Sequence, residues 1–207
     1  MSAREDILSA IRAGRTRGEA RQEAYRAPQS FTDALAQFMK SAQKAAAEVR
    51  QVSSAADIPQ AVAAILRDRN LPALIHLAGD AGLEALPWST APGLTVEHAP
   101  PGPDDAALAL APHAIAETGT LAYSSAPGSP ASWHFRPGLE IAVLEADAIL
   151  PNVESVVAKL KGAGPLPHTL NFVTGPSRTG DIEQTLELGA HGPKALVVLI
   201  VAVQEKS

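Results

Sequence analysis

The chain has 207 residues, which is enough for one sizeable hydrophobic core and a small appended arm. Hydrophobic residues make up 46% of it and aromatic residues only 4%, so the core must be aliphatic, and the net charge of −5 argues against a nucleic-acid binder, which needs a concentrated basic surface. The absence of cysteine excludes disulfides, thiolate nucleophiles and cysteine-held zinc or iron–sulfur clusters, so any redox centre must belong to a partner or to a diffusible cofactor.

Residues 1–29 are predicted to form an N-terminal helical arm. Ser2 and Glu5 fit a capping box and an apolar stripe follows them, so residues 3–13 should form a short amphipathic helix. The arginine-rich stretch that follows reads either as a solvated linker or as an electrostatic docking arm. The chain starts without an apolar signal core, and no apolar run approaches the roughly 20 residues of a membrane span, so we expect a cytoplasmic protein.

Residues 30–207 are predicted to form one α/β domain. Ser30 can cap a first helix, and strand-like and helix-like segments then alternate. This alternation predicts a mostly parallel sheet with helices on its faces. The segments that carry the prediction are a strand over 48–52, a helix opening at Asp57-Ile58-Pro59 and an apolar strand over 71–77.

An acidic residue inside an apolar stretch marks the first candidate site. Residues 112–123 read as a strand, a tight kink and a returning strand, with Glu117 at the kink. A carboxylate among Ala, Ile and Gly is costly unless it is paired, hydrogen-bonded or functional. Glu117 is therefore either a base, nucleophile or ligand-hydroxyl acceptor, oriented by Thr118 and Thr120, or it binds backbone amides to hold the kink.

The segment after this kink carries an aromatic and basic cluster. Residues 124–137 read as a loop that contains Trp133 and Arg136, and this loop is either a lid over a pocket or an apolar plug for the end of the sheet. A strand over 139–144 would then bury Glu140. Asn152 is expected to cap the next helix.

The second candidate site lies between a buried strand and a predicted helix. The strand over 170–173 breaks at Gly175-Pro176, and a helix is expected from Asp181 to Leu188. In an open parallel sheet such a loop lies at the carboxyl ends of the strands, and free N–H groups at a helix start suit an anion. The alternative is a helix cap with a solvated arginine. The loop offers two hydroxyls and a fixed cation, from Ser177, Arg178 and Thr179.

Two motifs in this order resemble a known family. The first is Ala116-Glu117-Thr118-Gly119-Thr120, and the second is Thr174-Gly175-Pro176-Ser177-Arg178-Thr179-Gly180-Asp181-Ile182-Glu183 followed by Leu188-Gly189-Ala190-His191-Gly192-Pro193. They resemble the LUD-domain family, specifically its lactate utilization protein C (LutC, YkgG-like) branch, over residues 30–205. Gly180 and Ala190 depart from the pattern, in which alanine and valine are more common, and Gly180 loosens the expected helix start.

The resemblance implies a fold and a cellular role. The fold is a three-layer α/β/α arrangement with a mostly parallel sheet, similar to the NagB/RpiA/CoA-transferase-like superfamily. The role is in bacterial oxidation of L-lactate to pyruvate, alongside iron–sulfur partner proteins (LutA- and LutB-like). No Walker-type phosphate loop, dinucleotide glycine fingerprint or metal-type histidine pair is present in the sequence, so we predict no metal site.

Three functional hypotheses follow. In the first, the chain is a component of lactate oxidation that binds a small carboxylate or phosphorylated metabolite: Arg178 pairs with the anion and Glu117 or His191 moves a proton. Because the chain lacks an electron acceptor, it could be only part of a catalyst. The other residues expected to line this site are Thr118, Gly119, Thr120, Gly175, Pro176, Ser177, Thr179 and Asp181.

The second hypothesis is a non-catalytic subunit that assembles or regulates iron–sulfur partners. The third, from fold analogy alone, is a CoA-transferase-like or folate cyclo-ligase-like enzyme that uses Glu117. A homo-oligomer is compatible with all three.

Overall fold

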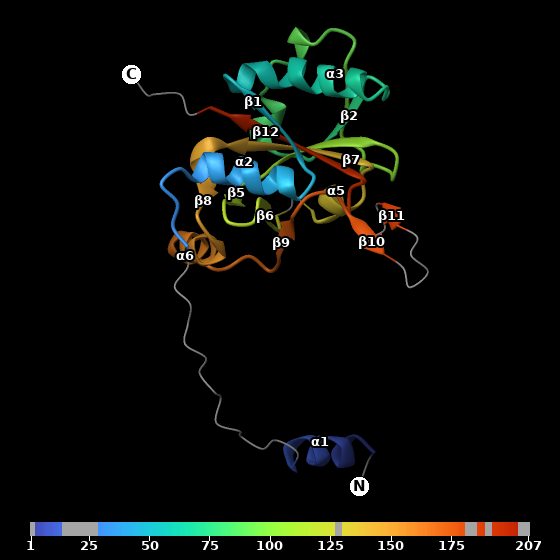
Figure 1. Cartoon of the computed structure of the whole chain (residues 1–207). Coiled ribbons are helices and arrows are strands. Elements are labelled where there is room, and N and C mark those ends of the chain that lie inside the picture. Colours follow the sequence, from blue (N-terminus) through green and yellow to red (C-terminus); the bar gives the residue numbers. More distant parts are fainter. Residues whose placement is uncertain (1–2, 14–28, 127–129, 181–185, 189–191, 203–207) are drawn as a thin grey trace.

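The computed structural model describes residues 3–13, 29–126, 130–180, 186–188 and 192–202. Its centre is a six-stranded sheet in the order β1-β12-β7-β4-β2-β3, in which every neighbouring pair is parallel (Figure 1). The predicted α/β fold with a mostly parallel sheet is confirmed. In sheet order the strands are Glu48–Val52, Ala195–Val201, Leu139–Glu145, Ala106–Leu110, Leu74–Leu77 and Thr95–Glu97.

The central strands β7 and β12 are buried on both faces because they are nearly continuous apolar runs. Side chains alternate between the faces, as the strand period of two requires. Leu139 and Ile141 join a core cluster with helix α3, whereas Ala142 and Leu144 join a cluster with helix α2 and a second sheet. Helices therefore cover both faces of the central sheet, as the sequence predicts (Figure 1).

The helices begin where capping side chains allow them to. Helix α2 is capped by Asp33, whose Oδ1 accepts a hydrogen bond from the Ala36 N–H at 2.9 Å, so the prediction of Ser30 as the cap is wrong. Asn152 caps α6 as predicted. The described helices are α1 Ala3–Ala13, α2 Ala34–Lys44, α3 Ile58–Asp68, α4 Ala81–Glu84, α5 Ser132–Phe135 and α6 Val153–Ala163, with 3-10 turns η1 Ala55–Asp57, η2 Trp88–Thr90 and η3 Ala146–Ala148.

A second sheet, in the order β8-β5-β6-β9, packs with α2 against one face of the central sheet. Strand β6 is antiparallel to both β5 and β9, which confirms the strand, kink and returning strand predicted around Glu117. Strand β9 is an edge strand of this mixed sheet and not part of the parallel sheet. The strands are β8 Ile149–Leu150, β5 His113–Ile115, β6 Thr120–Ser124 and β9 Leu170–Val173.

The helix predicted from Asp181 to Leu188 is wrong at its end, over residues 186–188, and residues 181–185 lie outside the described residues. Strand β10, Arg178–Gly180, pairs antiparallel with β11, Leu186–Leu188, so the last turn of the expected helix is a strand. In the sequence Ile182 and Leu186 have the i, i+4 spacing of a helix face, whereas Leu186 and Leu188 have the i, i+2 spacing of a strand face. Pairing with β10 decides between the two.

The predicted helix of the N-terminal arm is confirmed as α1, which has no buried residue. The division of the chain at residue 30 stays a prediction. None of the helices in the described ranges has the length and apolar character needed to cross a bilayer.

Candidate functional site

Helix α2 brings the two motifs together through two glycines. Gly119 lies in the turn between β5 and β6 with φ +70°, and Gly175 follows β9 with φ +74°. A methyl group on Gly119 would overlap backbone atoms of Ser41 and Ala42, and one on Gly175 would overlap the Ala45 carbonyl. Only glycine combines the left-handed backbone with this close approach, so both motif glycines serve the packing of α2.

A chain of threonine hydroxyls joins the motifs beside this helix. The Thr118 and Thr120 hydroxyl oxygens lie 2.6 Å apart, and Thr120 and Thr174 lie 2.7 Å apart. Thr120 is buried, whereas Thr118 and Thr174 are exposed. These hydroxyls therefore link the first motif, which contains Thr118 and Thr120, to the second motif, which begins at Thr174.

Glu117 is exposed, contrary to the expectation of a carboxylate in apolar surroundings. The kink is held by its backbone: the Glu117 N–H donates to the Pro151 carbonyl at 3.0 Å, and its carbonyl accepts from the Ser41 hydroxyl at 3.1 Å. The described residues give its carboxylate no hydrogen bond or ion pair. The Glu117 side chain is thus available to a ligand.

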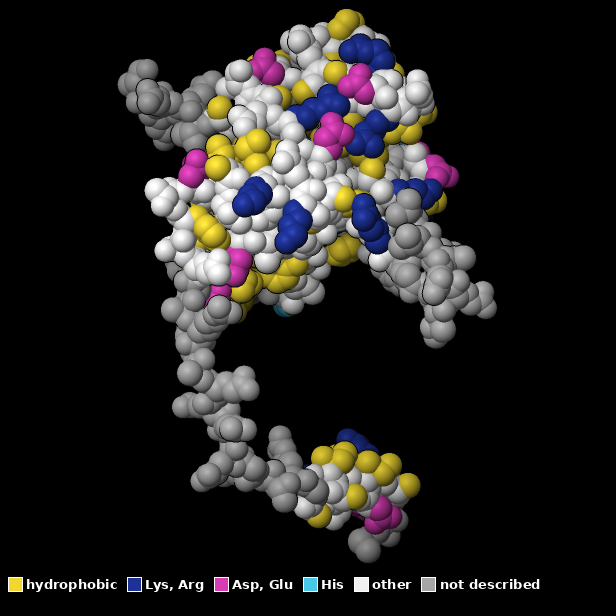
Figure 2. Space-filling model, viewed as in Figure 1, with side chains coloured by type: hydrophobic (Ala, Val, Ile, Leu, Met, Phe, Trp, Pro, Cys, Tyr) yellow, Lys and Arg dark blue, Asp and Glu magenta, His cyan; other side chains and the backbone are white. Residues whose placement is uncertain are grey.

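A groove of about 540 Å³ opens between α2 and this turn. Lys40 and Lys44, one helical turn apart on α2, line it together with Glu117 and Thr118. Figure 2 shows basic side chains over α2 on this face of the molecule. The remaining lining residues are Gln37, Ser41 and Ala45.

The lysines were not predicted as site residues. In the sequence the two lysines are marked only by their position: they lie four residues apart on the polar face of a helix, whose buried face carries Phe38 and Ala42. Such lysines are ordinary on solvated helices. The position of α2 against Gly119 is what brings them to the same groove as Glu117.

The Ser177 loop lies beside the amino ends of the central strands, and not at their carboxyl ends as expected. The Ser177 N–H donates to the carbonyl of Pro193, just before β12 begins, at 2.8 Å. Gly175, Pro176 and Ser177 line a small cleft of about 170 Å³ that is separate from the α2 groove. The expectation is wrong because β9 belongs to the second sheet.

The other predicted residues fall into two groups. Arg178 is exposed on β10 and lines neither the groove nor the cleft. The side chain of Thr179, and the whole of Asp181 and His191, lie outside the described residues. The structure thus brings Glu117 and Thr118 to one groove and Gly175, Pro176 and Ser177 to another, with the threonine hydroxyls between them.

A buried polar cluster lies beneath α5. His134 Nδ1 is 3.0 Å from Glu140 Oε1 and both side chains are 0% exposed. The Tyr123 ring stacks on His134, with ring centroids 3.7 Å apart. Burial, and then the charge of Glu140, raises the pKa of Tyr123 well above its usual value, so the phenol stays neutral. Trp133 packs with Ala78 and Ala107, which favours the plug over the lid for this segment.

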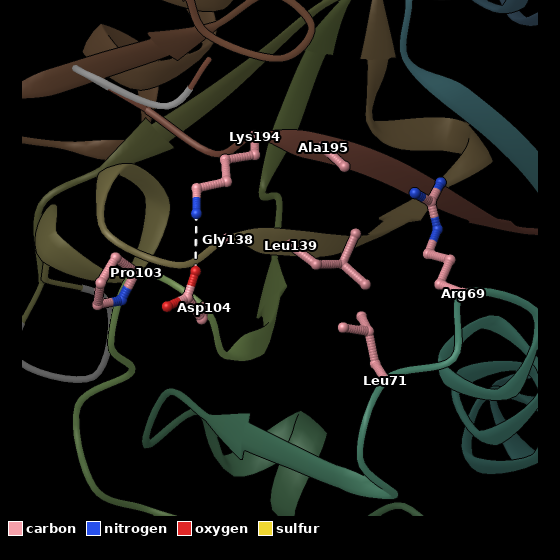
Figure 3. A pocket seen from close by; sticks show the side chains of 8 residues that line it. All are labelled: Arg69, Leu71, Pro103, Asp104, Gly138, Leu139, Lys194 and Ala195. Atoms are coloured by element: carbon pink, nitrogen blue, oxygen red, sulfur yellow. Dashed lines mark hydrogen bonds and ion pairs between the residues drawn. The ribbon is translucent and has the colours of Figure 1, made fainter. Parts of the chain in front are cut away.

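A third cavity, of about 320 Å³, lies at the amino ends of β4, β7 and β12 (Figure 3). Each of its two cations is paired: Lys194 Nζ lies 2.7 Å from Asp104 Oδ1, and Arg69 Nη2 lies 2.6 Å from Glu48 Oε2. Burial disfavours ionisation of Glu48, but hydrogen bonds from Arg50 and Arg69 outweigh it and lower its pKa. These pairs make the cavity less suited to an anion than the α2 groove.

Comparison with known proteins identifies the domain. Residues 105–201 match the LUD domain. Lactate utilization protein C of Geobacillus kaustophilus is 31% identical over 98 residues, covering 45% of this chain and 41% of that protein. The protein of the same name from Halalkalibacterium halodurans is 33% identical over 101 residues, covering 47% and 44%. The matched region therefore spans less than half the length of these relatives.

A solved structure extends the likeness to most of the chain. The crystal structure of a DUF162 family protein from Deinococcus radiodurans has a TM-score of 0.56 and 26% identity, and covers 84% of this chain and 99% of that one. Residues 105–201 therefore match the LUD domain, and the chain is similar to proteins of the lactate utilization protein C branch of that family.

Proposed function

We propose that this protein is a cytoplasmic component of L-lactate utilization and that the groove between α2 and the Glu117 turn binds a small anionic metabolite. The observation that carries the ligand site is the convergence of Lys40 and Lys44 with Glu117 and Thr118, where the first family motif meets α2. The names of the relatives support the lactate system.

The groove has the chemistry to recognise a 2-hydroxy acid. Two ammonium groups attract a carboxylate, and the Thr118 hydroxyl can donate a hydrogen bond to it. The Glu117 carboxylate would repel a simple anion, but it can accept the proton of a substrate hydroxyl. A molecule with a carboxylate and a neighbouring hydroxyl satisfies both requirements, and L-lactate is such a molecule.

Catalysis would divide between this chain and its partners. Oxidation of L-lactate to pyruvate releases two electrons and two protons. Glu117 would take the hydroxyl proton, while the hydrogen on the adjacent carbon leaves as two electrons and a proton to an acceptor in an iron–sulfur partner. The chain contains no cysteine that could hold a cluster, which supports this division.

Two observations weigh against placing the anion at the Ser177–Arg178 loop. Residues 178–180 form strand β10, so the described part of the loop includes no helix start that would supply free N–H groups. Arg178 also lines neither the α2 groove nor the small cleft beside Ser177. A nucleophilic role for Glu117, as in CoA-transferase-like chemistry, has less support because water reaches its exposed side chain.

Calorimetric titration tests the proposal. The full chain is titrated with L-lactate, pyruvate and inorganic phosphate, and compared with Lys40→Ala/Lys44→Ala, with Arg178→Ala and with the charge-matched control Arg67→Ala/Lys159→Ala. We expect L-lactate binding that weakens at least about tenfold in the first variant, equivalent to roughly 1.4 kcal/mol, and is unchanged in the other two.

The other outcomes are equally informative. Loss of binding in Arg178→Ala alone would return the site to the Ser177 loop. Absence of binding by the wild-type chain would reject the ligand site and favour the non-catalytic subunit, which co-purification with the iron–sulfur partner proteins would then test.

A further inference from the structure

Three threonine hydroxyls connect the α2 groove to the small cleft beside Ser177. Thr118 lines the groove and Thr174 lines the cleft, and both residues are exposed. Thr120 lies between them and is only 5% exposed. Its hydroxyl oxygen is 2.6 Å from that of Thr118 and 2.7 Å from that of Thr174. Two surface sites therefore share one buried hydroxyl group.

The strand register fixes the contact between the two motifs. Strands β6 and β9 are antiparallel, with Leu121 opposite Val173. One position further along the same register, Thr120 lies opposite Thr174. Residues directly opposite on one face of an antiparallel pair are close enough for threonines to form a hydrogen bond. The contact therefore depends on the pairing of β6 with β9 and not on the conformation of a loop.

The chain of hydroxyls has a direction, because each threonine has one proton to donate. If Thr118 donates to Thr120, then Thr120 donates to Thr174, and the Thr174 proton is left for a partner in the cleft. In the opposite direction Thr174 donates to Thr120, and Thr120 donates to Thr118. The Thr118 proton is then left for a partner in the groove.

Other arrangements of the three protons are unfavourable. If both outer hydroxyls donated to Thr120, its own proton would be buried without an acceptor among the described residues. If no proton lay between two of the oxygens, they would repel each other, since 2.6 and 2.7 Å are hydrogen-bond distances. Only one end of the chain of hydroxyls therefore donates outward at a time.

We propose that Thr120 is a positioning residue that couples the α2 groove to the cleft by fixing the direction of these hydrogen bonds. This rests on the proposed function, in which the Thr118 hydroxyl donates to the carboxylate of a 2-hydroxy acid. With that ligand bound, Thr174 presents its oxygen as an acceptor and favours a group with N–H or O–H donors in the cleft. An acceptor bound to Thr174, such as a second carboxylate, reverses the direction and weakens the ligand in the groove.

Substitutions of Thr174 test the direction because they fix it in opposite senses. In Thr174→Val, Thr120 can donate only to Thr118, so the Thr118 proton faces the groove. Calorimetric titration should then give a lower Kd for L-lactate, by about twofold if the wild type populates both directions equally. In Thr174→Asp the carboxylate accepts from Thr120, and the Kd should rise at least about tenfold. A merely structural role of Thr174 would raise the Kd in both variants.

The matched control removes the shared hydroxyl. In the Thr120→Val background, Thr174→Asp should raise the Kd only through repulsion between its charge and the ligand, at least about fivefold less than when Thr120 is present. Thr120→Ser keeps the hydroxyl and should restore the full effect. Because Thr118 and Thr174 are exposed, water can replace the partner that each loses in Thr120→Val. An equal effect of Thr174→Asp with and without the Thr120 hydroxyl would overturn the proposal.

A measurement without ligand separates this proposal from the ligand site itself. The NMR signal of the Thr118 methyl group reports the hydrogen bonding of the adjacent hydroxyl. It should move on Thr174→Val, a neutral change, only when Thr120 carries its hydroxyl. If the wild-type chain does not bind L-lactate but the methyl signal moves in this way, the ligand site fails and the coupling stands. If L-lactate binds and the signal does not move, the coupling fails and the ligand site stands.

Discussion

Two polar regions of this protein, both beside β6, are built in opposite ways. Beneath α5, Glu140 is fully buried: its Oε1 pairs with His134, which stacks on the Tyr123 ring, and its Oε2 is buried without a hydrogen-bond partner among the described residues. At the α2 groove, Glu117 is exposed and its carboxylate has no partner among the described residues. The buried acid is committed to holding the fold, whereas the exposed one is available for a ligand. If the proposed ligand site is correct, burial does not mark the functional acid of this protein.

Breaking the buried Glu140–His134 pair should produce the largest loss of stability. Glu140→Ala or His134→Ala leaves an uncompensated polar or charged group in the core, and we expect a loss of about 3–5 kcal/mol in the free energy of unfolding. Urea denaturation of the purified chain measures this. The double variant Glu140→Leu/His134→Leu should lose less than either single change, and a loss of under about 1 kcal/mol in both singles would contradict the assignment.

Substitutions of Gly119 and Gly175, on which α2 packs, should produce the next largest loss of stability. Gly119→Ala and Gly175→Ala each force a positive φ on alanine and overlap backbone atoms of α2, so we expect losses of about 2–3 kcal/mol. The matched control is Gly162→Ala, which meets nothing within 4 Å inside α6 and should be stabilising. Thermal unfolding of the three variants distinguishes them, and unchanged melting of Gly119→Ala would show that α2 is not seated as described.

Of the two regions, the buried one should make the stability of the protein fall at alkaline pH. The pKa of Tyr123 is raised in the folded state, so the folded protein binds more protons than the unfolded chain once pH exceeds about 10, and stability must fall as pH rises from there. Tyr123→Phe should flatten this decline and change stability at pH 7 by no more than about 1 kcal/mol. Chemical denaturation at pH 7, 9 and 10.5 provides the comparison, and an identical decline in the variant would remove Tyr123 as its cause.

The groove lysines should matter least for stability. Lys40→Ala/Lys44→Ala removes exposed side chains without a described ion pair, so the free energy of unfolding should change by less than about 0.5 kcal/mol. Any ligand affinity lost in this variant would therefore report the groove and not the fold. A stability loss of more than about 1 kcal/mol would instead assign the lysines a role in holding α2.

The fold was predictable from the sequence for local reasons. The runs that became β7 and β12 are apolar and bounded by turn residues, and α3 and α6 carry their own capping signals. The end of the helix expected at the second candidate site could not be predicted, because local signals there are ambiguous. The segment ending at Leu188 is compatible with a helix or a strand, and the partner that makes it a strand lies in β10.

The sequence by itself determined the aliphatic core, the strand and helix alternation, the kink at Glu117 and the absence of any cysteine-held redox centre, because each depends on residue type or short-range spacing. The tertiary structure decided which acid is buried, placed Lys40 and Lys44 opposite Glu117, and moved the Ser177 loop to the amino edge of the central sheet. These depend on contacts between segments far apart in the chain, such as α2 against Gly119 and Gly175, which no local pattern encodes.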